Sequence, residues 1–436
     1  MLYNDPSPLE VKVLTRLFSL PDSTSLDTYL AHEGFQGFQK ALAMKPEEIV
    51  GEVKVSNLRG RGGAGFPTGM KWSFVPRQSP KPKYIVVNGD ESEPGTCKDR
   101  LLIENDPHQL IEGMLIAGLA VDAHAGYIYI RGEYRYLIDI MDRAIEEAYR
   151  RGYLGKNILG SGFDFDARTH TGAGAYECGE ESALLESLEG KRGIPRIRPP
   201  FPAVAGAFQC PTVLNNVETY CAVPYILREG GAAFAALGTP KNGGTRLYCL
   251  SGHVSRPGVY ELPMGFNLLR MIEEVGGGMR NGKRLKAVIP GGSSCPVLTA
   301  EECDLPMDYD SVAKAGSMLG SGGVVVMDED TCMVKAAMRI MRFYAHESCG
   351  WCIPCREGTT WLRKILVRFH DGHGERSDID LIGELARNML GRTFCPLGDA
   401  AAMPTIAFVR KFREEFEAHL DGRPCPYEKT PQMVTA

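Results

Sequence analysis

Four cysteines near the C-terminus have a spacing that suits iron–sulfur chemistry. Cys349, Cys352 and Cys355 lie three residues apart in a Gly- and Pro-containing segment, and Cys395 follows further along the chain, directly before a proline. Three thiolates in such a row can bind three corners of one cubane, with the fourth ligand coming from a distant turn. A structural zinc site usually brings two separated cysteine pairs instead. The row therefore predicts a [4Fe–4S] cluster.

The fourth ligand has two candidates, because Cys425 precedes a proline just as Cys395 does. Cys425 lies in a Pro-rich tail, where poor order is the default expectation. Cys395 follows a predicted helix that can return to the loop, so we favour it. His346 precedes the row and is either a partner of a ligand or an ordinary surface residue. The nine cysteines outside the set, Cys425 among them, are expected to be small buried hydrophobes in a reducing compartment.

A glycine-rich loop from Gly60 to Gly65 matches the pattern G-x-G-x-x-G. A dinucleotide-binding loop should follow a strand, whereas the segment 46–53 ahead of this loop has a helical pattern. The sequence therefore argues against an ordinary Rossmann loop here. Bare backbone N–H groups, with Arg61 and Lys71 nearby, can still bind a phosphate. The alternative is a flexible surface loop.

Acidic residues follow the predicted buried strand 84–87, in the segment from Asn88 to Gly95. Ligands of α/β sheets bind at the carboxyl ends of strands. Three carboxylates in this segment repel one another, which also favours a binding site. The alternative is a solvated acidic turn. A third segment, Gly172 to Glu181, places Gly-Glu-Glu at the start of an apolar-periodic helix, where plain capping is a serious alternative.

The periodicity of the chain divides it into three segments. Residues 1–235 alternate strands and helices, which predicts an α/β domain with an N-terminal helical extension. Residues 236–330 predict a small β-grasp-like α+β domain, and residues 331–436 a helical bundle. The expected strands are 84–87, 126–130, 246–251, 258–262, 287–289 and 323–327, and the expected helices are 108–121, 137–149, 267–274, 333–344, 358–369, 378–389 and 405–419.

Composition excludes several classes of protein. With 49 Lys and Arg against 54 Asp and Glu, the net charge of −5 leaves no broad basic field for nucleic acid or an anionic membrane. The most apolar run, 114–121, is far shorter than the ~20 residues that a membrane-spanning helix needs. The N-terminus has neither a secretory nor a transit-peptide pattern. We therefore expect a chain in the cytosol or on a surface facing it.

Taken together, these motifs resemble the flavin- and NADH-binding subunit of respiratory complex I, of the 51-kDa type. The resemblance extends from about Leu58 to Cys395, and its specific stretches are 58–69, 88–95, 172–181 and 346–355. It implies a Rossmann-like FMN- and NADH-binding domain, then a β-grasp-like domain and a cluster-bearing helical bundle.

The resemblance also implies the site residues. Those expected to bind FMN are Gly60, Arg61, Gly62, Lys71, Asn88, Asp90, Glu91, Ser92, Gly179, Glu180, Asn215, Asn216 and Thr219. Those expected near NADH are Phe66, Phe74, Glu93, Tyr176, Glu181, Arg198 and Phe201. Glu181 would favour NADH over NADPH by repelling a 2′-phosphate. Many relatives have Lys in place of Arg198, which puts its nucleotide contact in doubt.

The implied activity is hydride transfer from NADH to FMN, followed by single-electron transfer to the cluster and on towards quinone. The alternatives are the diaphorase subunit of an NAD-reducing hydrogenase or NAD-dependent formate dehydrogenase, and a non-catalytic iron–sulfur relay. The implied partners are a thioredoxin-like [2Fe–2S] subunit and a larger iron–sulfur subunit of the peripheral arm. No nucleic acid and no direct membrane insertion are expected. The resemblance implies that the chain lies at the cytoplasmic face of a bacterial inner membrane, where other subunits of the complex attach it to the membrane.

Overall fold

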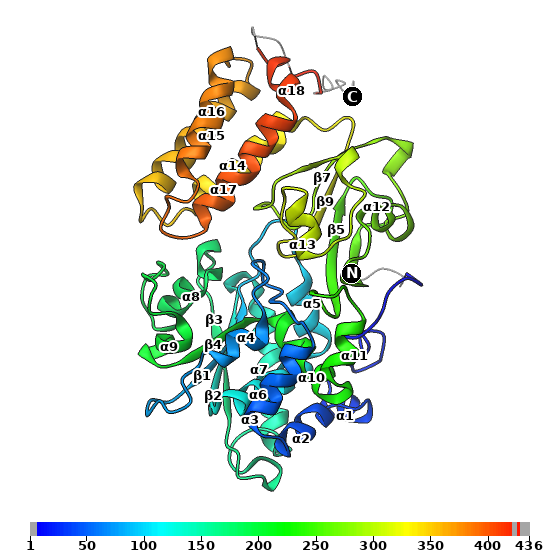
Figure 1. Ribbon diagram of the computed structural model, residues 1–436, viewed down its shortest axis with the longest axis vertical. Coiled ribbons are helices and arrows are strands. Elements are labelled where there is room, and N and C mark those ends of the chain that lie inside the picture. Colours follow the sequence, from blue (N-terminus) through cyan, green and yellow to red (C-terminus); the bar gives the residue numbers. More distant parts are fainter. Residues whose placement is uncertain (1–6, 421–424, 428–436) are drawn as a thin grey trace, which may run out of the picture.

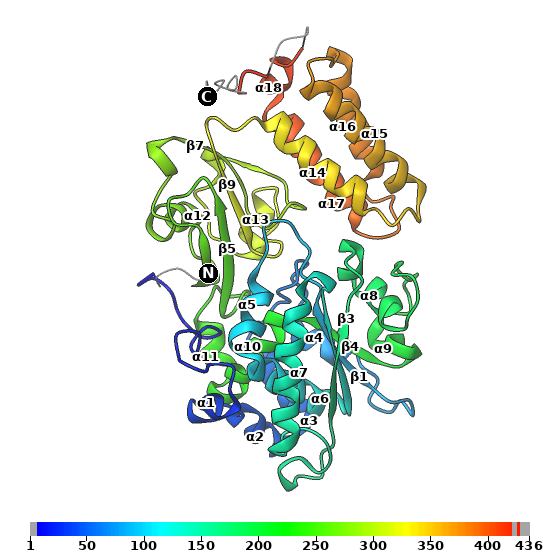
Figure 2. The same cartoon turned by 180° about the vertical axis from the view of Figure 1, so that it is seen from behind.

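The computed structural model describes residues 7–420 and 425–427. A four-stranded sheet with its helices occupies one end of the long axis, and helices α14–α18 occupy the other (Figure 1). A five-stranded sheet lies between them, to one side of the axis. The view from behind shows the same order (Figure 2). No helix in the described part of the chain is long and apolar enough to cross a membrane.

The first sheet is parallel, with strand order β3-β2-β1-β4. Its strands are β1 (Tyr84–Gly89), β2 (Ala125–Ile130), β3 (Asp166–Thr171) and β4 (Thr212–Asn216). β1 and β2 are the strands that the sequence predicts. β3 and β4 were not predicted, because both are edge strands with weak strand signals. β3 is largely polar, and two of the five residues of β4 are asparagines, which are depleted in strands.

Alternate side chains of the first sheet pack against different helices. Ile85 and Val87 belong to the large core that includes the helices α6, α7 and α10. Val86 and Tyr129 point the other way, into a smaller core with α8. The helices of this part are α1 (Leu26–Ala31), α2 (Gln36–Leu42), α3 (Pro46–Val55), α4 (Thr68–Ser73), α5 (Lys98–Asn105), α6 (Pro107–Val121), α7 (Arg135–Arg150), α8 (Glu181–Leu188), α9 (Pro202–Ala205), α10 (Val217–Glu229) and α11 (Gly231–Ala236).

The strand order of the first sheet creates a switch point between β1 and β4. The chain leaves β1 for β2 on one side and later returns to β4 on the other side. In register, Asn88 of β1 lies beside Asn216 of β4, both at the carboxyl ends of their strands. A crevice outside such a reversal is where open α/β sheets bind ligands. The acidic segment and the Asn215–Thr219 segment therefore begin at the same point.

The second sheet is mixed, with order β6-β5-β9-β7-β8. Its strands are β5 (Thr245–Gly252), β6 (Gly258–Pro263), β7 (Leu285–Ile289), β8 (Leu298–Thr299) and β9 (Gly323–Asp328). The four longer strands lie where the sequence predicts them. The expected helix 267–274 is present as α12 (Leu268–Arg270) and the wider turn Met271–Val275 that continues it, and α13 (Tyr309–Lys314) precedes β9.

The helical unit, residues 333–417, differs from the expectation at two helix starts. Its helices are α14 (Met333–Glu347), α15 (Ile353–His370), α16 (Arg376–Met389), α17 (Leu397–Lys411) and α18 (Arg413–Glu417). α15 begins before residue 358 because Pro354 fits the first turn of a helix. The expected helix 405–419 is wrong as a single element. α17 begins at Leu397, and Phe412 separates it from α18 because its backbone there is not helical.

The domain limits at 235/236 and 330/331 stay predictions. The first limit falls inside α11, which ends at Ala236, and the second falls just before α14.

Candidate functional site

Four segments that are distant in sequence meet at the switch point. Asn88 lies beside Asn216 and donates a hydrogen bond from its side-chain amide to the carbonyl of Gly179, 2.8 Å away. A Cβ added to Gly62 would lie 3.3 Å from the Cβ of Asn216. The glycine-rich loop, the acidic segment, the start of α8 and the end of β4 are therefore brought together.

The glycine-rich loop connects α3 to α4 and is held in one shape. The N–H of Gly60 donates to the carbonyl of Phe66 at 2.9 Å, and the Tyr309 hydroxyl donates to the carbonyl of Gly60 at 2.7 Å. Gly65 has a φ of 66°, and a Cβ there would lie 2.3 Å from the Tyr309 ring. Only glycine fits this position. The loop is a fixed element, so the alternative of a flexible surface loop is not supported.

Arg61 does not point out of this loop towards a phosphate, as the sequence suggested. Its side chain is buried and donates to the carbonyls of Gly243 and Thr245 at 2.8 and 3.0 Å. The backbone N–H of Arg61 donates to the Thr219 hydroxyl at 2.9 Å. The guanidinium therefore attaches the loop to the start of the second sheet, because an always-charged group can be buried only where acceptors surround it.

Asp90 has the features of a ligand-binding group. Its side chain is buried, and neither carboxylate oxygen has a hydrogen-bond partner among the described residues. Burial raises the pKa of Asp90 from its ordinary value of 3.8 to about 7. A Cβ at Gly179 would lie 3.4 Å from one of these oxygens, so that oxygen lies close to the segment before α8. Buried acceptors without donors are rare in folded proteins, and a bound group with hydroxyl or N–H donors would satisfy them.

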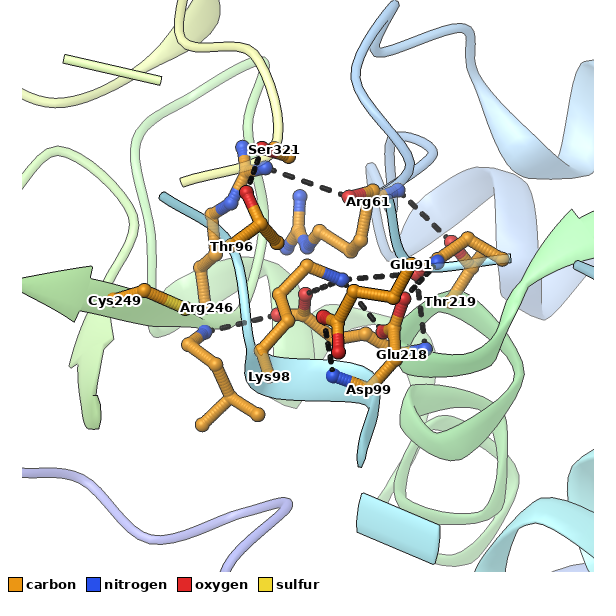
Figure 3. A network of polar contacts seen from close by, with 12 residues as sticks. Arg61, Glu91, Thr96, Lys98, Asp99, Glu218, Thr219, Arg246, Cys249 and Ser321 are labelled. Carbon is orange, nitrogen blue, oxygen red and sulfur yellow. Dashed lines mark hydrogen bonds and ion pairs between the residues drawn. The ribbon is translucent and has the colours of Figure 1, made fainter. Parts of the chain in front are cut away.

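Glu91 is occupied within the protein. Its carboxylate accepts the N–H groups of Asp99 and Arg100 at 2.8 and 3.1 Å, at the start of α5. Burial, with the Asp99 charge, raises the pKa of Glu91 to about 8. Beside it, the buried Lys98 pairs with Asp99 at 2.7 Å and with Glu218 at 2.8 Å (Figure 3). The sequence reading missed Lys98, Asp99 and Glu218, although the first two follow the acidic segment closely.

The amides that end β4 are also engaged. Asn215 accepts a hydrogen bond from the indole N–H of Trp72 at 2.9 Å, and Asn216 donates to Asp99 at 2.6 Å. The hydroxyl of Ser92 donates at 3.4 Å to the carbonyl of Asp90. These contacts fix the walls of the site.

Glu181 lies between two cations at the start of α8. Its carboxylate contacts the Lys71 ammonium at 2.8 Å and the Arg198 guanidinium at 3.0 Å. Burial alone would raise the pKa of Glu181, but these two charges outweigh it and hold that pKa below its ordinary value. Glu180 instead caps α8, accepting the N–H groups of Ser182 and Ala183 at 2.9 Å each. The capping alternative therefore holds for Glu180, whereas Glu181 stays charged between Lys71 and Arg198.

Three aromatic side chains near this point are exposed. Phe66 and Phe74 lie with their ring centroids 6.1 Å apart, and they are 46% and 54% exposed. Phe201, at the start of α9, is 57% exposed. Large exposed aromatic side chains can stack on a flat ring.

Tyr176 and Glu93 connect the three parts of the molecule. The Tyr176 hydroxyl donates to Glu93 at 2.7 Å, and Glu93 accepts the N–H of Ser294 at 2.8 Å. The Tyr176 ring packs edge-on against Phe343 of α14, with centroids 5.1 Å apart. Both residues thus lie where the first sheet, the second sheet and the helical unit meet.

The four cysteines expected to bind a cluster line one pocket. The pocket is lined by these cysteines together with Glu177, Phe394 and other residues; the cysteines are Cys349, Cys352, Cys355 and Cys395. Such a thiolate set fits an iron–sulfur cluster. Cys425 does not line this pocket, and His346 is exposed and contacts Glu347.

The two sites are neighbours along the chain. Glu177 lines the cysteine pocket, while Gly179 contacts Asn88 and Asp90 at the switch point. In both overall views α8 lies beside the first sheet and below the near end of the helical unit (Figures 1 and 2). Arg192, beyond α8, also donates to the carbonyl of Cys349 at 3.1 Å.

Comparison with known proteins matches these parts of the chain to one family. The family described as Nuo51 FMN-binding domain matches residues 53–225, the NADH-ubiquinone oxidoreductase-F iron-sulfur binding region matches 335–419, and the SLBB domain matches 247–298. The chain is 56% identical to the second F subunit of the NADH-quinone oxidoreductases of Rhizobium meliloti, over 95% of this chain and 99% of that protein. The chain belongs to the family of NADH-quinone oxidoreductase F subunits.

Further relatives in this family agree. The F subunit of the Streptomyces coelicolor enzyme is 52% identical over 98% of this chain and 94% of its own length, and that of Mycobacterium tuberculosis is 51% identical over 97% of each. Among solved structures, a chain of an NAD⁺-reducing [NiFe]-hydrogenase in the H₂-reduced state superposes with a TM-score of 0.82 at 35% identity. That match covers 96% of this chain and 68% of the other. The resemblance found in the sequence is thus confirmed at the level of family and fold.

Proposed function

We propose that this chain is the electron-input subunit of a respiratory complex I, which oxidises NADH at a bound FMN and passes electrons through a [4Fe–4S] cluster towards quinone. The observation that carries the proposal is the position of segment 176–179. One of its residues, Glu177, lines the cysteine pocket, and two residues later the carbonyl of Gly179 accepts a hydrogen bond from Asn88 at the switch point. A nucleotide site and a cluster site are therefore held in fixed relation by one short segment.

The switch point suits FMN because Asp90 offers two buried oxygens there that have no hydrogen-bond donor among the described residues. In the proposed complex Asp90 accepts hydrogen bonds from FMN, and the glycine-rich loop offers backbone N–H groups to it. Other expected FMN-binding residues form hydrogen bonds within the protein and so hold the segments around the site in place: Arg61, Glu91, Asn215, Asn216 and Thr219. When bound, FMN accepts two electrons as hydride and releases them singly.

The residues proposed for NADH are those around Glu181. The three exposed aromatic side chains, Phe66, Phe74 and Phe201, would stack on the adenine. Glu181 keeps a negative charge there, which disfavours the 2′-phosphate of NADPH. Arg198 is paired with Glu181 and so acts by holding that carboxylate in position.

Anaerobic absorbance spectra of the purified protein test the proposal. NADH should bleach the flavin and NADPH much less. Glu181→Gln removes the negative charge and frees Lys71 and Arg198 to meet a 2′-phosphate. We expect the ratio of kcat/KM for NADH over NADPH to fall about 10-fold or more, which corresponds to ~1.4 kcal/mol.

Glu181→Asp is the matched control, because it keeps the charge and should keep most of the preference. Retained flavin and iron with no response of the wild type to either nucleotide would contradict the proposal. That result would favour the non-catalytic relay instead.

The hydrogenase diaphorase is the second candidate, because the solved hydrogenase shares the whole fold. The NADH-quinone oxidoreductase relatives are favoured by their higher identity and by the near-complete match of their length. Co-purification with membrane-bound subunits and quinone reduction by NADH would support complex I. Co-purification with a nickel-containing subunit would support the diaphorase.

The proposed partners are a thioredoxin-like [2Fe–2S] subunit and a larger iron–sulfur subunit of the peripheral arm, at the cytoplasmic face of a bacterial inner membrane. An exposed apolar surface supports docking beside the cluster. Trp351 and Ile353 flank Cys352 and are 57% and 66% exposed, and Trp361 on α15 is 50% exposed. Exposed aromatic and aliphatic side chains of this size are typical anchors of protein interfaces.

A further inference from the structure

A second group of metal-ligating side chains lies outside the cluster pocket. Cys332 precedes α14, His419 follows α18, and Cys425 comes after both in sequence. One ligand atom from each lies within 4.8 Å of the other two, and all three side chains are buried. The Sγ of Cys332 is 3.4 Å from the Nε2 of His419. Two buried thiols and an imidazole at these distances need only a small approach to share one ion.

The imidazole of His419 is oriented for this role. Its Nδ1 lies 2.7 Å from the carbonyl oxygen of Glu415, which can only accept a hydrogen bond, so Nδ1 carries the proton. In the neutral form of the ring, Nε2 is then the nitrogen without a proton, and this nitrogen faces Cys332. Metal-bound histidines are held in this way, with the second ring nitrogen donating to a carbonyl or carboxylate.

This group is separate from the iron–sulfur pocket. α14 runs for 15 residues from Met333, next to Cys332, to Glu347, just before Cys349. At 1.5 Å per residue, the two sites lie about 22 Å apart at opposite ends of one helix. Figure 1 shows α18 at the end of the helical unit that points away from the first sheet. Cys425 is thus too remote to be the fourth ligand of the cluster.

We propose that Cys332, His419 and Cys425 bind a zinc ion. Two thiolates and an imidazole are ligands that Zn²⁺ prefers. Binding displaces the two thiol protons to solvent, while the neutral histidine releases none. The resulting site has two negative charges against two positive ones, which suits a buried position. Among the described residues the set stops at three ligands, and a water molecule can complete the tetrahedron.

The metal would cross-link segments that are distant in sequence. The Sγ of Cys332 already accepts the N–H of Lys335 at 3.3 Å in the first turn of α14. Glu415 accepts the N–H of Met333 at 3.0 Å and pairs with Lys286 of the second sheet at 2.7 Å. A zinc ion here joins the start of α14, the end of α18 and the segment at Cys425 into one cross-linked corner.

Metal analysis of the purified full-length protein, with its iron–sulfur cluster intact, tests the proposal. We expect one zinc per chain beside the iron of the cluster. Absorption at the zinc K edge should show two sulfur neighbours at about 2.3 Å and nitrogen or oxygen neighbours at about 2.0–2.1 Å. Cys332→Ser and His419→Gln should each lower the zinc content at least several-fold while the iron content is unchanged.

Cys303→Ser is the matched control, because Cys303 is also buried and its thiol donates to the Thr299 carbonyl, as a serine can. It should keep its zinc. A wild-type protein with full iron and no zinc, even after incubation with equimolar Zn²⁺, overturns the proposal. Zinc that survives in both ligand variants also overturns it. A Cys332–Cys425 disulfide found by mass spectrometry would replace the metal site with a redox pair.

Discussion

Asp90 lies at the switch point, and both of its buried carboxylate oxygens lack a hydrogen-bond donor among the described residues. Its ordinary pKa is 3.8, and burial raises it to about 7. The folded state therefore binds the Asp90 proton more tightly than the unfolded state does. Ionisation of Asp90 lowers the free energy of unfolding as the pH rises above about 4, and this loss reaches its full size above pH 7. Each pKa unit corresponds to about 1.4 kcal/mol. In flavin-free protein, Asp90→Asn should raise the free energy of unfolding by about 2–4 kcal/mol at pH 8.

Urea denaturation at two pH values checks this expectation. The gain should shrink to about half at pH 5.5, where the Asp90 carboxyl of the folded wild type is largely protonated. Asp139→Asn is the control, since Asp139 is exposed on α7. A gain that is absent at pH 8, or equal at both pH values, would show that Asp90 carries no cost of burial.

The sequence predicts which residues form the candidate site, but it does not predict the contacts that these residues make with one another. Glycines, an acidic strand end and paired asparagines are visible in the sequence, and the switch point brings them together. The direction of Arg61 was not predictable, because its acceptors, Gly243 and Thr245, lie far along the chain. The partnership of Cys332 with His419 and Cys425 was missed for the same reason.

At the scale of elements, the buried ion pairs around Lys98 join α5 to α10 and the second sheet (Figure 3). Glu218 of α10 pairs with Lys98 and also accepts the N–H of Leu247 in β5 at 2.9 Å. Lys98→Met leaves the carboxylates of Asp99 and Glu218 without their cation, near Glu91. Removing one partner of a buried pair costs about 3–5 kcal/mol. We expect a loss of that size in urea denaturation.

An exposed pair provides the comparison for this variant. Arg270 and Glu274 are one helical turn apart on the surface, and Arg270→Ala should leave the denaturation midpoint unchanged. A Lys98→Met protein within about 1 kcal/mol of the wild type would mean that the two carboxylates take up protons at little cost.

Element boundaries show where local signals fail. The long amphipathic helices are found from their helical period, and the two central strands of the first sheet are found from short runs rich in apolar and β-branched residues. β3 and β4 at the sheet edges are not, and α17 begins at Leu397 rather than near residue 405. α17 begins directly after Cys395 and Pro396, and both Cys395 and Leu397 line the cysteine pocket. The start of this helix therefore depends on contacts with distant residues and not on helix propensity alone.

At the scale of the whole molecule, the cluster pocket lies beside an exposed apolar surface on α15. Ile353 and Trp361 lie about two turns apart on α15 and about 80° apart around its axis, so they occupy adjoining faces of the helix, and both are largely exposed. Because electrons must leave through a protein partner, we expect this surface to dock the larger iron–sulfur subunit. Truncating an aromatic anchor costs about 2 kcal/mol or more. The double variant Ile353→Ala, Trp361→Ala should weaken that complex about 30-fold or more.

Equilibrium binding to the purified partner subunit, with iron content and NADH–ferricyanide activity measured in parallel, checks this expectation. Neither substituted side chain binds the cluster, so iron content and the activity of the isolated chain should stay at wild-type levels. Val55→Ala removes a comparably exposed side chain from α3, at the opposite end of the molecule, and should bind normally. Unchanged affinity of the double variant would move the docking surface away from α15, and electron exit would then have to occur on another side of the cysteine pocket.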